Sequence, residues 1–401
     1  MSETFVVVGG GLAAGKAVEQ LRMSGFDGQV VLFAAEPHAP YERPPLSKEY
    51  LLGKGTLDSV FVNSDAWYVE NKVTLRTGER VTAINRSAHT VWTHDGEFRY
   101  DRLLLATGAQ PRALPFDTAG VPVAYLRTIE DSKQLKAQLR PGKRVVLIGG
   151  GWIGLEVAAA AALAGCEVTV IVPDALPLEK VLGPEVASVF ADLHRSKGVT
   201  FHTQARATGI TTEAGVASVL LDSGAAVATD LVVAAVGVAP DTVLAEAAGL
   251  VVDNGIVVDA SLATSDPDVF TAGDAANAYH PVLGRRLRVE HWDNAIAQGR
   301  VAARNMLGEG AAYERLPYFF TDQYELGMEY VGYTGDGYDQ VIVRGETSAL
   351  SFTAWWLAGG KVLAGMHVND WDAIEDIRRL VGTRVGPEQL RAADSLGAIP
   401  G

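Results

Sequence analysis

The chain has 401 residues, 48% of them hydrophobic and 20% charged, which is typical of a globular protein too long for one ordinary core. Its 34 basic and 48 acidic side chains leave a net charge of −14, which argues against nucleic acid as a partner. No run of about 18 apolar residues is present, and the chain enters an apolar strand without a signal-peptide pattern. We therefore expect a cytoplasmic protein of several domains that does not enter a membrane.

The N-terminal segment carries a first dinucleotide fingerprint. The apolar run Thr4–Val8 predicts a buried parallel strand, and the turn Gly9–Gly11 follows it and opens a predicted helix. Such a turn aims backbone N–H groups and the positive end of a helix dipole at a pyrophosphate. Ala14 stands at the third glycine position, which the motif allows, and Glu36 ends the next predicted strand, where a carboxylate can accept hydrogen bonds from a ribose. A tight turn without a ligand is the alternative.

A second fingerprint follows about 140 residues later. The apolar run 143–148 leads into three glycines, Gly149, Gly151 and Gly154, and into an alanine-rich predicted helix. At the end of the next predicted strand, Val172 stands where a ribose-binding acid is expected, and Asp174 comes two positions later. No arginine cluster follows that would hold a 2′-phosphate, so NADH is favoured over NADPH. Two such sites in one chain predict two dinucleotides that can exchange electrons.

The remaining sequence suggests how the chain is divided. Leu104–Gly108 and Leu231–Gly237 end the two fingerprint units, and the segment 109–122 between them is rich in proline, alanine and glycine. A later strand runs into Gly273-Asp274, after which we expect a helix. Beyond residue 317, aromatic residues cluster and strands alternate with turns, which predicts a small α+β domain. In that domain we expect a hairpin turn at Gly359-Gly360 and two closing helices.

The octapeptide Tyr41-Glu42-Arg43-Pro44-Pro45-Leu46-Ser47-Lys48 resembles the signature that follows the second strand in oxygenase-coupled, NADH-dependent ferredoxin reductases. Further matching segments occur in the same order as in that family: Gly9–Ala13, Leu104–Gly108, Leu126–Thr128, Gly149–Glu156, Ala272–Asp274 and Phe319–Tyr324. The resemblance implies an α/β fold of the glutathione reductase type, with two Rossmann-type domains and a small C-terminal α+β domain. It divides the chain into an FAD-binding domain (1–110 and 241–316), an NAD(H)-binding domain (111–240) and an interface domain (317–401).

The same resemblance implies a role for individual residues. Gly9, Gly11, Ala13 and Ala14 would line the FAD pyrophosphate, and Glu36 would reach the ribose, although the family often has Asp one place earlier, where Ala35 stands. Arg43 and Lys48 would lie along the flavin end, and Trp292 at its pyrimidine edge, where a helix start would stabilise the anionic reduced ring. The other residues implied for FAD are Val81, Ala106, Thr107, Gly108, Arg127, Asp274 and Ala295. Those implied for NADH are Gly149, Gly151, Ile153, Gly154, Glu156 and Gly237.

Lys48, Glu156 and Trp292 are the predicted catalytic residues. Opposite charges in a low-dielectric pocket favour each other's ionised forms, so Lys48 and Glu156 are expected to pair. Lys48 would stabilise charge developing in the reduced ring, and Glu156 would accept a hydrogen bond from the nicotinamide carboxamide. A surface lysine and a helix-capping glutamate are the alternative reading.

The single cysteine, Cys166, excludes an intrachain disulfide and a redox-active cysteine pair. We expect it to be a small buried hydrophobe rather than a reactive thiol. The histidines show no metal-ligand spacing, and no metal is predicted. Without a dithiol, electrons from NADH must pass from the flavin to a small oxidant or singly to a protein partner.

The resemblance implies that this partner is a two-iron two-sulfur ferredoxin serving a cytochrome monooxygenase or a Rieske oxygenase. Candidate basic contacts for an acidic ferredoxin are Arg285, Arg286, Arg288, Arg300 and Arg304, although ordinary solvated charge explains them equally well. Phe320 stands where the family often has Trp. Two other readings remain open: a flavin NADH oxidase or other small-acceptor reductase, and a nucleotide-binding redox sensor.

Overall fold

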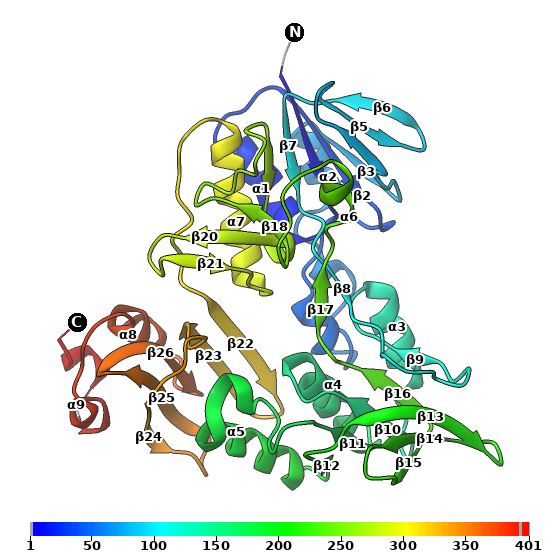
Figure 1. Cartoon of the computed structure of the whole chain (residues 1–401), viewed down its shortest axis with the longest axis vertical. Coiled ribbons are helices and arrows are strands. Elements are labelled where there is room, and N and C mark those ends of the chain that lie inside the picture. The colour runs from blue at the N-terminus through cyan, green and yellow to red at the C-terminus, as the bar shows by residue number, and fades with distance from the viewer. Residues whose placement is uncertain (1–2, 393–394, 401) are drawn as a thin grey trace. The chain divides into compact units, whose positions relative to one another are not determined.

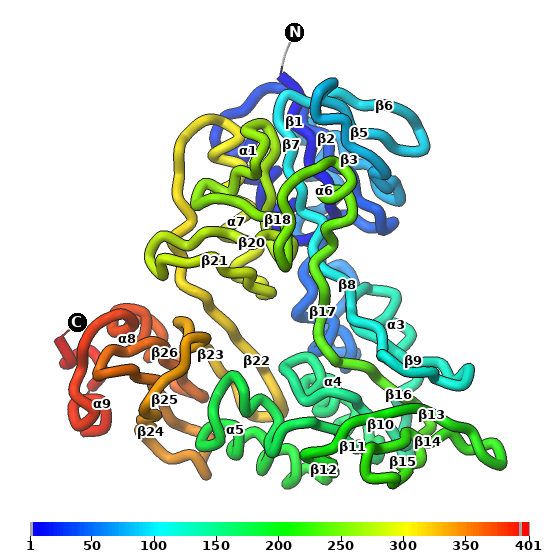
Figure 2. Tube along the Cα trace, in the orientation of Figure 1, coloured from blue at the N-terminus to red at the C-terminus, as the bar shows by residue number. Residues whose placement is uncertain are grey.

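The computed structural model describes residues 3–392 and 395–400, which fall into two compact units (Figures 1 and 2). The first unit comprises Met1–Pro44, Thr56–Gln110 and Val238–Leu316. The second comprises Pro45–Gly55, Pro111–Gly237 and Pro317–Gly401. Each unit is therefore assembled from three separate stretches of the sequence.

A five-stranded parallel sheet forms the centre of the first unit, in the order β19-β7-β1-β2-β3. Its strands are β1 (Thr4–Val8), β2 (Gln29–Ala34), β3 (Val73–Thr77), β7 (Arg102–Leu105) and β19 (Val269–Thr271). Val8 pairs with Phe33 on one side and Leu105 on the other, so these strands end together. Both faces are buried, as the continuous apolar runs predict. On one face, α1 (Leu12–Met23) and α7 (Trp292–Met306) pack side by side (Figure 1).

Two smaller sheets complete the first unit, and one corrects a prediction. The first is antiparallel and consists of β4 (Ala83–Asn85), β5 (Thr90–Thr93) and β6 (Gly96–Arg99); the second consists of β18 (Ile256–Val258), β20 (Ala276–His280) and β21 (Arg285–Leu287). The helix expected after Gly273-Asp274 was wrong, because a 3-10 turn at Gly273–Ala275 leads directly into β20. The backbone of β20 bonds to strands on both sides, and this pairing outweighs the local helix preference of its alanines. The short helices of the unit are α2 (Asp65–Glu70) and α6 (Val243–Ala247).

The second unit repeats this plan around the second fingerprint. Its parallel sheet has the order β12-β11-β10-β16-β9, made of β9 (Val123–Ala124), β10 (Arg144–Ile148), β11 (Glu167–Ile171), β12 (Thr200–His202) and β16 (Leu231–Ala234). Between β12 and β16 in the sequence, the chain forms an antiparallel sheet of β13 (Ala207–Glu213), β14 (Val216–Leu221) and β15 (Ala226–Thr229). The helices are α3 (Ile129–Gln138), which a capping box at Thr128 begins, α4 (Trp152–Leu163) and α5 (Glu179–Ser196). The short strands β8 (Ala109–Pro111) and β17 (Val238–Pro240), which apart from Pro111 belong to the first unit, pair with each other.

The C-terminal part of the second unit is a five-stranded antiparallel sheet, and the two predicted closing helices follow it. Its order is β22-β23-β26-β25-β24, with β22 (Tyr318–Gln323), β23 (Leu326–Gly332), β24 (Gln340–Glu346), β25 (Ser351–Ala358), β26 (Lys361–Val368), α8 (Ile374–Leu380) and α9 (Pro387–Ala392). Gly359 and Gly360 both have positive φ, which confirms the hairpin turn between β25 and β26. The sheet packs on α5, where the Trp356 indole donates a hydrogen bond to the Leu182 carbonyl at 3.1 Å. The three-domain division of the sequence stays a prediction.

Candidate functional site

The first glycine of each fingerprint occupies a backbone position that only glycine suits. Gly9 has φ +135°, and a methyl group on it would lie 2.0 Å from the Ala106 carbonyl oxygen. Gly149 has φ +110°, and a methyl group there would lie 2.3 Å from the Ala235 carbonyl oxygen. Each turn therefore packs closely against the residue that follows a neighbouring parallel strand, Ala106 after β7 or Ala235 after β16. The two fingerprints share one geometry.

The second glycines, Gly11 and Gly151, lie at the N-caps of α1 and α4. Neither N-cap has a side-chain hydrogen bond to the first helical N–H groups, which an anion can instead satisfy. At Gly151 nothing lies within 4 Å of an added methyl group, so there is open space in front of this helix start. At Gly11 the nearest group is the Arg43 guanidinium, 3.1 Å from such a methyl. Both helix starts fit a bound pyrophosphate.

The third glycine position holds Ala14 in the first fingerprint and Gly154 in the second, and packing explains the difference. A methyl on Gly154 would lie 2.3 Å from the Gly149 carbonyl oxygen, so the second copy requires glycine here. Ala14 is fully buried in the core of the first unit, where its methyl group is accommodated. The neighbouring Ala13 contacts two further segments, since methyl groups on Gly273 or Gly299 would come within 3.1 and 2.4 Å of its atoms. The Gly273-Asp274 turn thus lies beside Ala13 at the start of α1.

Glu36 follows β2 and is held by two side chains of the predicted signature. The Tyr41 hydroxyl donates to Glu36 Oε2 at 2.6 Å, and Arg43 Nη2 lies 3.5 Å from Glu36 Oε1. The Arg43 guanidinium also stacks over the Tyr41 ring, 5.2 Å from its centroid. Glu36 keeps more than a quarter of its side chain exposed, so its carboxylate can still accept hydrogen bonds from a ribose.

The remaining predicted FAD residues of the first unit lie at strand ends or at the start of α7. Ala106 follows β7, the Thr107 hydroxyl donates to the Asp241 carbonyl at 2.6 Å, and Gly108 has positive φ. Val81 is buried with Phe33 in the core on one face of the sheet. Trp292 begins α7, and its indole Nε1–H donates to Glu42 Oε2 at 3.0 Å. Ala295, one turn on, packs in the same core as Ala13.

The second unit brings together Lys48 and Glu156, which the resemblance paired. Lys48 Nζ lies 2.8 Å from Glu156 Oε1, and only 10% and 6% of their side chains are exposed. Ser47 donates to Glu156 Oε2 at 2.5 Å, and Thr321 of β22 donates to Oε1 at 2.7 Å. The alternative of a surface lysine and a helix-capping glutamate is therefore wrong, because both groups are buried and Glu156 lies in the second turn of α4. Phe320 covers the ammonium, with Nζ 5.2 Å from its ring centroid.

The segment Pro45–Gly55 holds Lys48 in place because it packs into the second unit. Ser132 of α3 donates its hydroxyl to the Leu46 carbonyl at 2.8 Å. Leu51 is buried among Leu135, Val157 and other apolar side chains of α3 and α4. Lys48 is thereby fixed over α4, the helix that begins at the second glycine turn.

The other predicted residues of the second unit differ in exposure. Ile153 is 43% exposed in the first turn of α4, and Gly237 is exposed after β16 with positive φ. The Arg127 backbone N–H donates to Asp131 Oδ2 at 3.0 Å next to the α3 capping box. Val172 is buried against the glycine turn, so it offers no polar group to a ribose. Asp174 is partly exposed, and its Oδ1 lies 3.0 Å from Lys180 Nζ.

Ser47 and Thr321 are site residues that the sequence reasoning did not single out. Both stand inside segments that matched the family, but nothing in the sequence indicated that their hydroxyls meet Glu156. Two further polar side chains behind Thr321, Gln323 and His194, are also fully buried.

The proposed docking arginines are only partly available. Arg288 is 10% exposed and pairs with Glu290, and Arg286 donates to the Val258 carbonyl at 2.6 Å. Arg304 pairs with Glu309 at 2.6 Å, whereas Arg300 is exposed. With 10% of its side chain exposed, Arg288 offers little surface to a partner, which disfavours it as a docking contact.

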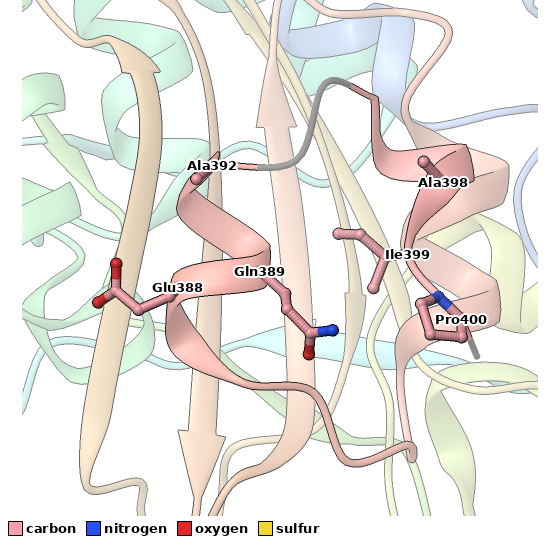
Figure 3. Close-up of a pocket in the computed structure, with 6 residues that line it drawn as sticks. All are labelled: Glu388, Gln389, Ala392, Ala398, Ile399 and Pro400. Atoms are coloured by element: carbon pink, nitrogen blue, oxygen red, sulfur yellow. The ribbon is translucent and has the colours of Figure 1, made fainter.

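Neither Cys166 nor the pocket beside α9 takes part in the contacts of the Lys48–Glu156 pair. Cys166 is half-buried, its thiol donates to the Arg140 carbonyl at 3.3 Å, and burial raises its pKa, which disfavours the reactive thiolate. Within residues 3–392 and 395–400, no cluster of His, Cys, Asp and Glu can hold a metal, and no helix is long and apolar enough to cross a membrane. A pocket beside α9 contains none of the predicted residues (Figure 3); it is lined by Glu388, Gln389, Ala392, Ala398, Ile399 and Pro400.

Comparison with known proteins identifies the family. Residues 3–299 match the model of the pyridine nucleotide-disulphide oxidoreductases, and residues 318–397 match a reductase C-terminal model. The chain belongs to the pyridine nucleotide-disulphide oxidoreductase family. It is therefore an oxidoreductase, and this family uses FAD and NAD(H), the two cofactors that the sequence predicts.

Within this oxidoreductase family, the relatives confirm the resemblance to ferredoxin reductases of oxygenase systems. The chain is 42% identical over 398 residues to the ferredoxin–NAD(+) reductase component of the anthranilate 1,2-dioxygenase system of Burkholderia cepacia, covering 98% of this chain and 97% of the relative. It is 40% identical to putidaredoxin reductase of Pseudomonas putida, covering 92% and 89%. A crystal structure of the covalent putidaredoxin reductase–putidaredoxin complex matches with a TM-score of 0.93 and 38% identity, covering 98% and 97%. These matches confirm the predicted α/β fold.

Proposed function

We propose that this oxidoreductase is an FAD-dependent NADH:ferredoxin reductase, which passes electrons singly to a two-iron two-sulfur ferredoxin. One observation carries the proposal: two equivalent glycine turns, each ready for a pyrophosphate, occur in a chain with a single cysteine. A chain with one cysteine has no dithiol to take an electron pair, so the electrons must leave to an external acceptor. The names of the relatives, which are ferredoxin reductase components, support a ferredoxin as that acceptor. The ferredoxin would in turn serve a cytochrome monooxygenase or a Rieske oxygenase.

We assign FAD to the first unit and NADH to the second. In the first unit Gly9, Gly11 and Ala13 would lie against the FAD pyrophosphate, and Glu36 would accept from the ribose hydroxyls. The residues of this unit assigned to hold the rest of FAD are Ala14, Arg43, Val81, Ala106, Thr107, Gly108, Asp274, Trp292 and Ala295. Arg127, which belongs to the second unit, is assigned to FAD on the family resemblance alone. In the second unit, the open helix start at Gly151 would receive the NADH pyrophosphate, with Gly149, Gly154, Ile153 and Gly237 around it.

Bound FAD would supply the chemistry, because it can take a hydride from NADH and release electrons one at a time. Lys48 would provide a fixed positive charge that stabilises negative charge as the hydride is accepted. Glu156 holds this ammonium and would orient the nicotinamide. Its carboxylate has about four lone-pair sites, of which Lys48, Ser47 and Thr321 occupy three, so it can still accept from a carboxamide N–H.

Two features support NADH as the donor. Asp174 places a partly exposed carboxylate just beyond β11, where the 2′-phosphate of NADPH would be repelled. Lys180, at the start of α5 just beyond the loop that follows β11, is already paired with Asp174 at 3.0 Å. Since NADH is held inside cells, we also assign the protein to the cytoplasm.

The test is an anaerobic titration of the purified yellow protein with NADH, followed by addition of a two-iron two-sulfur ferredoxin and cytochrome c. We expect one FAD per chain, bleaching of the flavin by one equivalent of NADH, and fast cytochrome c reduction only when ferredoxin is present. Equally fast turnover with dioxygen alone would indicate an NADH oxidase. Negligible turnover with every acceptor would indicate a nucleotide-binding sensor.

A further inference from the structure

We propose that Thr321, Gln323 and His194 form a chain of hydrogen-bond donors that positions the Glu156 carboxylate. The inference rests on the proposed role of Glu156 in hydride transfer and adds three positioning residues to it. All three side chains are essentially buried, with at most 1% of each residue exposed. They belong to β22 and α5, which lie far from the second fingerprint in the sequence.

The contacts form a continuous path from α5 to the ion pair. His194 Nε2 lies 2.8 Å from Gln323 Oε1, Gln323 Nε2 lies 3.0 Å from Thr321 Oγ1, and Thr321 Oγ1 lies 2.7 Å from Glu156 Oε1. The Tyr324 hydroxyl lies 3.5 Å from the other ring nitrogen of His194, Nδ1. No link in this path from His194 to Glu156 is exposed to solvent.

The carboxylate at the end of this path fixes the direction of every bond in it. A carboxylate can only accept, so Thr321 must donate its hydroxyl proton to Glu156. The Thr321 oxygen then accepts from the Gln323 amide N–H, which leaves the Gln323 carbonyl facing His194. His194 must therefore donate from Nε2 and carry its proton there. Tyr324 faces the unprotonated Nδ1, which is consistent with this tautomer.

The protonation state of His194 is consistent with this direction of the hydrogen bonds. Burial lowers the pKa of His194 to about 4, so the ring is neutral at physiological pH and has a single N–H to donate. The aromatic rings of Phe201 and Tyr324 pack edge-on against it, at centroid distances of 6.2 and 5.1 Å. The ring is thus held by packing as well as by its bond to Gln323, and the path begins at a rigid point.

The arrangement has a specific consequence for Glu156. Its Oε1 atom is shared between the Lys48 ammonium and the Thr321 hydroxyl, so Thr321 fixes the plane of the carboxylate relative to Lys48. Without the hydroxyl, the carboxylate can rotate toward Ser47 and Lys48, and an approaching carboxamide would meet a less ordered acceptor. Loss of Thr321 should therefore slow hydride transfer more than it weakens NADH binding.

The first test is ring-nitrogen NMR of the oxidised, FAD-loaded protein with ¹⁵N-labelled histidine and no NADH. The His194 signal is identified by its loss in His194→Asn. We expect a neutral ring with its proton on Nε2 at pH 7. A proton on Nδ1, or a doubly protonated ring, would overturn the proposed direction. This measurement does not depend on enzymatic activity. It is made on the parent protein, and His194→Asn serves only to assign the signal.

The second test compares Thr321→Val, which keeps the shape and removes the hydroxyl, with Thr321→Ser, which keeps the hydroxyl. We expect Thr321→Val to lower the limiting rate of flavin reduction about tenfold with little change in the dissociation constant of NADH, and Thr321→Ser to stay near the parent. Thr353→Val is the matched control, because Thr353 is a buried threonine of the same antiparallel sheet that contacts Trp355 instead of Glu156.

The outcomes separate this inference from the proposed function. If Glu156→Gln slows reduction but Thr321→Val behaves like Thr353→Val, the positioning path is wrong and the proposed role of Glu156 stands. If Glu156→Gln leaves the rate of flavin reduction unchanged, the proposed role of Glu156 is wrong, and the positioning path that rests on it is wrong as well. If Thr321→Val does not fold, Thr321→Ser and the tautomer of His194 still decide: slow reduction in Thr321→Ser, or a proton on Nδ1, contradicts the path.

Discussion

Lys48 and Glu156 form an ion pair with 2.8 Å between Nζ and Oε1, inside a unit where both side chains are nearly inaccessible to water. Burying two charges gains little stability, because the loss of hydration offsets their attraction. The pair instead fixes the geometry of the site, because Ser47, Thr321 and Lys48 all bind the Glu156 carboxylate. Such an arrangement is expected where charge must be held at one point during a reaction.

Lys48→Ala should slow the reduction of bound FAD by NADH about 100-fold, because the fixed positive charge is lost. Stopped-flow mixing under anaerobic conditions measures this rate. The unfolding free energy should fall by less than about 3 kcal/mol, since Ser47 and Thr321 still donate to Glu156. Unchanged reduction in Lys48→Ala would rule out the role of Lys48.

Two controls distinguish catalysis from folding in this prediction. Lys197→Ala breaks a more exposed ion pair with Glu325, 2.9 Å long, and should leave reduction unchanged. Adding Glu156→Gln to Lys48→Ala removes the unpaired carboxylate, so the double variant should regain stability without regaining the rate. A double variant as fast as the parent would show that only the structure had been disturbed.

Gly151→Ala should fold normally and raise the KM for NADH about tenfold, because a methyl group fits the open space at the α4 start but fills the place of the pyrophosphate. FAD content should not change. Gly149→Ala is the contrasting variant. Gly149 has φ +110°, and an added methyl group would lie 2.3 Å from the Ala235 carbonyl oxygen, so the second unit should be destabilised. Steady-state kinetics and thermal unfolding of the two variants check this pair of expectations. A Gly151→Ala variant with the parent's KM would place the pyrophosphate elsewhere.

Asp174→Ala should reduce the preference for NADH over NADPH about fivefold, measured as the ratio of kcat/KM values, because a carboxylate near a 2′-phosphate is removed. The Lys180 ammonium, which Asp174 now neutralises at 3.0 Å, would also become available to that phosphate. Lys180→Ala is the matched control and should increase the preference for NADH. If both variants keep the parent's ratio, this loop does not select the cofactor.

The sequence predicted the parts of the fold that local patterns determine. β1 spans the predicted Thr4–Val8, and the predicted turn at Gly359-Gly360 lies between the paired strands β25 and β26. The helix after Gly273-Asp274 was wrong because the pairing of β20 with β18 is a long-range contact that no local window contains.

The candidate site was predictable only in part. The glycine turns follow from spacing, because a strand, a tight turn and a helix start are one local unit. The pairing of Lys48 with Glu156 came from the family resemblance, since nothing in the spacing brings Pro45–Gly55 onto α4. Thr321 bonds to Glu156, and His194 is linked to Thr321 through Gln323, only because β22 packs against α5, so neither role could be read from the sequence.

The buried ring of His194 predicts how stability depends on pH. Its pKa is about 4 in the folded protein, against an ordinary value of 6.5, because burial disfavours the charged ring. Between these two values the unfolded chain binds a proton that the folded chain does not, so stability is full above pH 6.5 and decreases as the pH falls toward 4. The loss over this window should be about 3 kcal/mol. Urea unfolding of the FAD-loaded protein between pH 7 and 4 measures it.

The variant His194→Asn isolates this contribution. Asparagine does not titrate, so the variant should be less stable at pH 7 but should lose less stability than the parent between pH 6.5 and 4. Parallel slopes in the parent and His194→Asn would mean that the His194 ring keeps its ordinary pKa in the folded protein, and would contradict this prediction.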